Sequence, residues 1–292
     1  RLVTDTRSLH ELFLVLEENV PLGGLSPFCA SCALNKVRSL AHSRTSFAEV
    51  YSHPECEALL GNIINIFRSQ GQEVFSHHNL IMLALALAEL EADSKNTAAL
   101  EIWGYAAEAI AVRARGNLDP RGLATAARAL ALVHGSGRLP YHPVAMKALA
   151  SRFERILDDS NPQDLATTCW ALNVVNELQD RRFICTICAR VLPDIAAFNV
   201  LDLANIMSSV SSAFKDFPAS EIPIVLDLFS AATELIDHAT WKDKELLSPE
   251  TLASLICSLG TYVSVGGRGA AGLIWELITK AQKRFKQFDE SQ

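Results

Sequence analysis

A short pattern that recurs five times along the chain constrains its fold more than any single residue does. The clearest copy is Asn161-Pro-Gln-Asp-Leu-Ala-Thr-Thr-Cys-Trp-Ala-Leu172. Asn161 is suited to cap a helix, Pro162 needs no N–H donor at the first helical position, and Asp164 places a negative charge against the helix dipole. The pattern therefore predicts a helix that begins at this point.

Each copy aligns on one leucine, which we call the anchor. In chain order the anchors are Leu80, Leu123, Leu165, Leu203 and Leu252. A second apolar residue follows seven positions later in every copy, so each copy carries one apolar stripe at helical spacing. Position +1 after the anchor is alanine in four copies, and position +6 is alanine or serine in all five. Such small residues let a neighbouring helix approach closely.

The spacing of the anchors predicts the architecture. They lie 43, 42, 38 and 49 residues apart, which is long enough for two helices and two turns. One helix cannot bury the apolar stripe alone, whereas stacked helix pairs can. Hydrophobic residues make up 49% of the chain and aromatic residues 7%, which favours helix on helix over sheet. We therefore expect an all-α protein, an α-solenoid of stacked helix-turn-helix repeats.

The repeat also predicts how the chain is organised. Residues 1–74 are expected to form N-terminal capping helices and degenerate repeats, and residues 75–292 the helical repeat array with a C-terminal capping helix. A repeat array is one continuous object, so no internal domain boundary is expected. Before residue 75 the register is open, because both Ser26-Pro27 and Ser43-Arg-Thr-Ser-Phe47 can open a helix. The longest apolar stretch, residues 80–90, is shorter than the roughly 18 residues of a membrane span, so no membrane span is expected.

The chemistry-bearing residues predict neither catalysis nor a cofactor. No pairing of a nucleophile with a general base stands out in the sequence, so we expect a protein that is not an enzyme. Seven cysteines form an odd set within apolar helical patterns, which disfavours a disulfide framework. Two Cys-x-x-Cys pairs, Cys29 with Cys32 and Cys185 with Cys188, would bind zinc only if they met in space. Because they lie in different repeats, 153 residues apart, no metal site is expected.

Two columns of residues vary among the copies and are the candidates for recognition. The first column lies two residues before the anchor and contains His78, Arg121, Gln163, Leu201 and Glu250. The second column lies two residues after it and contains Met82, Thr125, Thr167, Asn205 and Ser254. In RNA binders that read one base per repeat, polar columns of this sort contact base edges while nearby Arg or Lys holds phosphate. The alternative is that the two columns merely face solvent and bind nothing. The net charge of −7 favours this alternative.

Arg121 and Arg128 lie one helical stripe apart, with Thr125 between them, and so predict a basic edge on an acidic protein. Replacing both arginines by glutamate is expected to leave folding nearly intact, because exposed substitutions usually cost within about 0.5 kcal/mol. The complete set of candidate RNA-binding residues is Arg121, Thr125, Arg128, Gln163, Thr167, Asn205 and Ser254.

The copies that open with Asp119, Asn161 and Ser248 resemble the octotricopeptide and heptatricopeptide repeats of organellar proteins. They are also similar to the helical region of FAST-kinase-like and RAP-domain proteins. The resemblance covers about residues 75–290, although the chain after Gly269 reads as a plain helix where a RAP domain would follow. It implies residence in mitochondria, or alternatively plastids. It also implies binding to organellar RNA as part of a large ribonucleoprotein such as the mitochondrial ribosome, beside neighbouring proteins. The rival expectation is a scaffold that holds protein subunits of an organellar complex without touching RNA.

Overall fold

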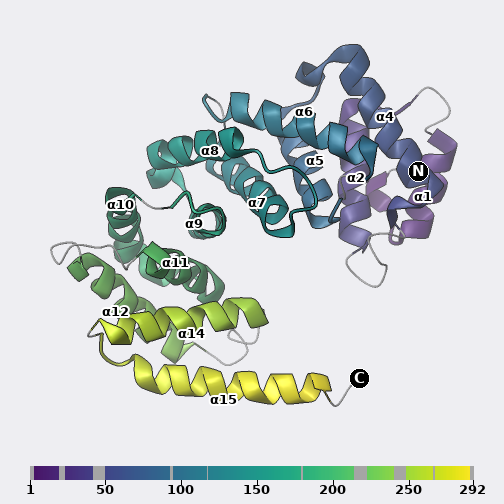
Figure 1. Ribbon diagram of the computed structural model, residues 1–292. Helices are drawn as coiled ribbons and strands as arrows, with labels where there is room; N and C mark the ends of the chain where they lie inside the picture. The colour runs from purple at the N-terminus through teal and green to yellow at the C-terminus, as the bar shows by residue number, and fades with distance from the viewer. Residues whose placement is uncertain are drawn as a thin grey trace. The chain divides into compact units, whose positions relative to one another are not determined.

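A computed structural model gives the structure of residues 3–19, 24–41, 50–92, 95–116, 118–178, 180–213, 222–239, 248–265 and 267–289. Throughout these ranges the regular structure is helical and no strand occurs. The chain divides into two compact units, Arg1–Phe153 and Glu154–Gln292 (Figure 1). The sequence predicted no such division. A stack in which each helix touches mainly its neighbours can divide at any joint, because no long-range contacts tie distant repeats together.

The first unit begins with a 3₁₀ turn and then alternates helices with short connections. Its elements are η1 (Val3–Asp5), α1 (Leu9–Asn19), α2 (Pro27–Ala41), α4 (Pro54–Gln70), η2 (Gln72–Val74), α5 (His77–Glu89), α6 (Thr97–Arg113) and α7 (Pro120–Ser136). Helix α8 (Pro143–Ile156) spans the division between the two units.

The second unit continues in the same manner. Its elements are η3 (Leu157–Asp159), α9 (Pro162–Val174), α10 (Arg181–Val191), η4 (Leu192–Ala197), α11 (Val200–Ala213), α12 (Ile222–His238), α14 (Pro249–Ser264) and α15 (Ala270–Asp289).

Every predicted capping residue caps its helix. In each copy the side-chain oxygen accepts a hydrogen bond from the backbone N–H three residues later, which satisfies a donor that the helix itself leaves unpaired. The bonds run from Asn79 to Ser76 (3.1 Å), Gly122 to Asp119 (2.9 Å), Asp164 to Asn161 (2.9 Å), Asp202 to Asn199 (2.9 Å) and Thr251 to Ser248 (3.2 Å). The repeated opening of the sequence is thus a repeated helix start.

The helices stack in sequence order, which confirms the all-α solenoid class. We call the helices that carry an anchor A helices and their partners B helices. In the first unit α7 packs on α5, α5 packs on α2 and on its B helix α6, and α6 packs on α4. In the second unit α11 lies between α9 and α14, and α14 runs beside α15 (Figure 1).

The apolar stripe of each A helix forms the core. All five anchors are buried, and so is the apolar residue seven positions after each: Leu87, Leu130, Leu172, Val210 and Leu259. The small residues at position +6 are buried too, as their proposed role in close helix approach requires: Ala86, Ala129, Ala171, Ser209 and Ser258. Phe75, Leu118 and Phe198, which precede three of the caps, are also buried and suit a hydrophobic staple.

Two A helices end in the same way. A left-handed residue follows each of them: Glu91 (φ 49°) after α5 and Asn176 (φ 57°) after α9. In both cases the next N–H bonds back to the carbonyl five residues earlier, from Ala92 to Leu87 and from Glu177 to Leu172. This is the Schellman closure. It escaped prediction because neither left-handed residue is glycine.

Near the N-terminus the structure shows a helix at one of the two possible openings. Helix α2 begins at Pro27 after Ser26, whose hydroxyl accepts a hydrogen bond from the N–H of Cys29 at 3.2 Å. Since α2 packs on α5 as one A helix packs on the next, it acts as the A helix of an additional pair with α4. The other register, at residues 43–47, lies outside the described residues. The predicted change of repeat type at residue 75 stays a prediction.

Candidate nucleic-acid interface

The first column lies in the opening turn of the A helices, where the capping geometry fixes its position. Each member stands two residues after its cap, and His78, Arg121, Gln163 and Leu201 are all exposed. The side chain of Glu250 lies outside the described part of the chain. Backbone N–H groups at the same helix starts add partial positive charge. One side chain per repeat is therefore presented at an equivalent, solvent-facing position.

The second column lies one turn further along each helix and is half-buried in all five copies. Its members are held to different degrees. The Thr125 hydroxyl donates to the carbonyl of Arg121 at 2.8 Å, which leaves its oxygen lone pairs free to accept. The Ser254 hydroxyl instead shares a hydrogen bond with Ser208 on α11, so this candidate helps to join two A helices.

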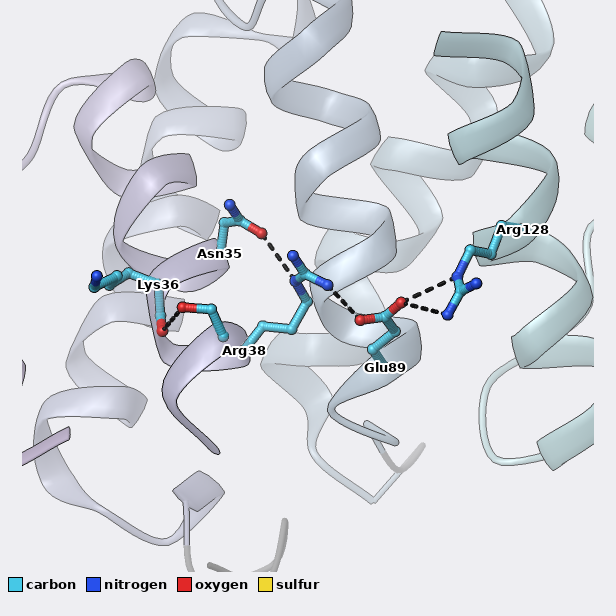
Figure 2. A network of polar contacts seen from close by, with 6 residues as sticks. Asn35, Lys36, Arg38, Glu89 and Arg128 are labelled. Atoms are coloured by element: carbon cyan, nitrogen blue, oxygen red, sulfur yellow. Dashed lines mark hydrogen bonds and ion pairs between the residues drawn. The ribbon is translucent and has the colours of Figure 1, made fainter. Parts of the chain in front are cut away.

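Arg128, predicted to be part of an exposed basic edge, belongs to a polar network (Figure 2). Its Nε and Nη2 each lie 3.1 Å from an oxygen of Glu89 on α5. The other Glu89 oxygen accepts from Nη1 of Arg38 on α2, and Arg38 Nε donates to Asn35 at 2.9 Å. One carboxylate thus joins three successive A helices.

The burial of the Glu89 carboxylate makes this network important for the structure. The Glu89 side chain is only 10% exposed, whereas that of Arg128 is 48% exposed. A carboxylate so far from water needs its cationic partners, since an unpaired buried charge is costly. These contacts favour a structural role for Arg128, and the expectation that it can be replaced without loss of folding stays a prediction. No local pattern predicts this pairing, because Glu89 lies 39 residues away in the preceding copy.

Arg121 differs from Arg128 in its contacts. Among the described residues no hydrogen bond or ion pair engages its side chain. Other arginines join elements instead, as the pairs Arg68 with Glu101 (2.8 Å), Arg138 with Glu91 (3.0 Å) and Arg190 with Asp194 (2.8 Å) show. Of the two arginines of the predicted basic edge, only Arg121 has its full hydrogen-bonding capacity available for a ligand.

In the second unit, small polar residues link neighbouring A helices, whereas in the first unit charged residues link them. The Ser212 hydroxyl donates to Asn173, which links α11 to α9. The hydroxyls of Ser211 and Ser258 lie 2.9 Å apart and link α11 to α14. From sequence alone these residues are indistinguishable from a solvated helix face. They hold the A helices of this unit in register, and with Ser208 and Ser254 they form a hydroxyl ladder.

The cysteines form no ligand set in the described residues. No group of three or more His, Cys, Asp or Glu side chains gathers there with the geometry of a metal site. Burial raises the pKa of Cys56 and of Cys188 to about 12, and it raises the pKa of Cys169 further. Cys29 and Cys257 are exposed. The buried thiols are thus protonated, apolar packing groups at neutral pH.

An open groove runs between the B helices of the first unit. Its volume is about 610 Å³, and its walls include Tyr105 and Val112 of α6 and Val144 of α8. The two valines are 58% and 54% exposed. Polar groups of both charges also line it, namely Glu101, Glu108, Arg115 and His142, and Arg68 forms an ion pair with Glu101. Exposed valines among mixed charges suit a peptide segment.

None of the described helices is long and apolar enough to cross a membrane.

Comparison with known protein families, with curated proteins and with solved structures found no match to this chain.

Proposed function

We propose that this chain is a non-enzymatic helical-repeat protein that binds RNA through the opening turns of its A helices. The observation that carries the proposal is the regularity of the two columns. The four copies on α5, α7, α9 and α11 each offer one exposed side chain and, a turn later, one half-buried side chain. Base-reading repeat proteins use two or three side chains per helical repeat in this way.

The chemistry of the columns suits base edges in the copies from α5 to α9. His78, Arg121 and Gln163 carry hydrogen-bond donors, and His78 and Gln163 also carry acceptors. Thr125 and Thr167 add short hydroxyls beside two of them. Leu201, in the next copy, has no polar group and could contact a base only by stacking or apolar packing. The polar candidates therefore lie on α5 and α7 of the first unit and on α9 of the second unit.

We place the protein in mitochondria, or alternatively in plastids, as a subunit of a large ribonucleoprotein such as the mitochondrial ribosome. The resemblance of its repeats to those of organellar RNA-binding proteins supports this part of the proposal. The net charge of −7 suits a subunit held partly by protein neighbours, because an acidic protein gains little from phosphate contacts alone.

Purification of the native protein after crosslinking, followed by sequencing of the attached RNA, tests the proposal. The expected result is enrichment of a defined set of organellar transcripts. Arg121→Glu should lower RNA affinity and reduce the salt dependence of binding by about one phosphate contact. Lys147→Glu on the exposed face of α8 makes the same change in charge and is the control. Equal affinity for both variants would argue against α7 as part of the RNA surface.

The second candidate function is a protein-binding scaffold in an organellar complex, and the groove between α6 and α8 favours it. Exposed valines are a poor choice for a surface that meets only water, and apolar surface rimmed by charge is typical of protein interaction sites. Mass spectrometry of the co-purifying assembly separates the candidates. Ribosomal or other RNA-binding partners together with crosslinked RNA support the first, and protein partners without RNA support the second.

A further inference from the structure

Two polar side chains on α7, Arg121 and Thr125, form a surface that we call the α7 pair. They lie four residues apart, so they are neighbours on one face of the helix. Arg121 is exposed and Thr125 is half-buried. The closest acidic residue along the chain, Asp119, uses Oδ1 to accept from the N–H of Gly122 at 2.9 Å. No described residue bonds the guanidinium of Arg121, which therefore keeps its N–H donors for a ligand.

The hydrogen bonds within the α7 pair fix what it can offer to a ligand. A threonine hydroxyl has one proton, and Thr125 donates that proton to the backbone carbonyl of Arg121 at 2.8 Å. Towards a ligand the hydroxyl can therefore only accept. A guanidinium can only donate, and it does so through adjacent N–H groups held in one plane. The α7 pair thus presents two donors beside one acceptor.

This pattern selects among the groups of an RNA chain. A phosphodiester matches only half of it, because its oxygens accept from Arg121 but carry no proton for Thr125. A base edge matches both halves where two adjacent acceptors stand next to a donor. Cytosine has that order in O2, N3 and the N4 amino group, and guanine has it in N7, O6 and N1–H. In adenine and uracil a donor separates the acceptors, so neither base fits.

The other copies whose column side chains are described offer different patterns. On α5 the corresponding residues are His78 and Met82, and the methionine sulfur is only a weak acceptor. On α9 the amide of Gln163 carries both donors and an acceptor, so it can pair with any base edge. On α11 Leu201 has no polar group. Among these copies, only α7 requires two adjacent acceptors.

We propose that the α7 pair reads one base of a bound RNA and selects cytosine or guanine over adenine and uracil. The inference rests on the proposed function and adds to it the bases that one copy accepts. Arg121 donates to the two adjacent acceptors, and Thr125 accepts from the donor beside them. A bidentate contact of this kind discriminates between bases by about tenfold.

Fluorescence anisotropy of the full chain with four short oligouridine RNAs, which differ only in the central base, tests the proposal. Uniform flanks let that base reach the α7 pair in any register. Probes with central cytosine or guanine should bind about tenfold tighter than those with adenine or uracil. Tighter binding of cytosine alone or guanine alone also supports the inference and identifies the edge that is read.

Two variants separate base reading from charge. Arg121→Lys keeps the charge but loses the planar fork, so it should bind the four probes alike with an unchanged salt dependence. Thr125→Val removes the acceptor in a side chain of similar shape and should reduce the preference by about threefold. Lys147→Gln removes an exposed charge on α8 and is the control, which should keep the preference. Circular dichroism shows whether each variant is folded.

Equal affinity of the wild-type chain for the four probes overturns this inference and leaves the proposed function standing. So does a preference that survives Arg121→Lys. Equal weakening of all four probes in Arg121→Gln, with the preference intact, assigns Arg121 to a phosphate and overturns the inference as well. Binding of none of the probes, together with a native protein that yields no crosslinked RNA, overturns the proposed function itself.

Discussion

Arg121 and Arg128 lie seven residues apart on α7 but differ in what their side chains contact. Arg128 neutralises the nearly buried carboxylate of Glu89, while Arg121 engages no described partner. A charged residue in a repeat protein can serve either the joint between helices or a ligand. Which of the two it serves depends on a side chain about 40 residues away, which no local pattern in the sequence reveals.

The two arginines should therefore respond differently to the same substitution. Arg128→Glu places a carboxylate beside Glu89 and should lower the free energy of unfolding by about 1–2 kcal/mol. Arg121→Glu should change it by less than about 0.5 kcal/mol, because the site is exposed and an acidic residue suits a helix start. Urea unfolding of the two variants measures the difference. Equal losses of stability would show that Glu89 does not need Arg128.

Because of the buried thiols, the free energy of unfolding should fall as the pH becomes alkaline. An unfolded cysteine has a pKa near 9.0, whereas burial raises the pKa of Cys56 and Cys188 to about 12 and that of Cys169 further. Above pH 9 the unfolded chain releases protons that the folded chain retains, so the free energy of unfolding falls as pH rises. Below pH 8 this contribution should be constant.

Urea unfolding between pH 8 and pH 10 measures that slope. Cys169→Ala should make the free energy of unfolding fall less steeply with pH, because the variant lacks the Cys169 thiol that keeps its proton in the folded chain. This holds whatever the effect of the substitution on stability at pH 8. Cys29→Ser, at an exposed site, is the matched control and should leave the slope unchanged. An identical slope in all three proteins would mean that the buried thiols titrate normally.

At the scale of the helix, the sequence predicted most of what the structure shows. Capping residues, anchors and small positions repeat, and together they locate helix starts, the buried stripe and the close contacts between A helices. Helix ends were less predictable. The left-handed residues that close α5 and α9 are Glu91 and Asn176, where no glycine marks the turn. By contrast, α7 ends at Ser136 where Gly137 adopts the left-handed conformation, so a glycine does mark that end.

The small residues of the A helices should not tolerate enlargement. Ala129 at position +6 of α7 is fully buried, and Ala129→Leu should cost about 1–3 kcal/mol because extra methyl groups force neighbouring helices apart. Ala189→Leu on α10 is the control, since an exposed alanine has room for the larger side chain. Thermal unfolding compares the two. A variant at position 129 as stable as the control would contradict the close-packing account of the repeat.

At the scale of the whole molecule, the candidate site is only partly readable from sequence. The periodicity that locates the columns also places His78, Arg121 and Gln163 at equivalent positions of their helices, and all three face solvent. Whether a column residue is available for a ligand is a different question, because contacts between copies decide it. Ser254 illustrates this, since its hydroxyl is engaged by Ser208 on the preceding A helix. The polar networks differ between the two units, so no single repeat consensus could describe both.

The central claim is that RNA is bound at the opening turns of the A helices, and mapping of crosslinked residues tests it most directly. The native protein is irradiated with its RNA, digested, and analysed by mass spectrometry for peptides that carry a nucleotide. We predict nucleotide adducts on the peptides that contain His78, Arg121 and Gln163. Adducts confined to B helices, or a purified assembly that holds protein partners and no RNA, would contradict the account.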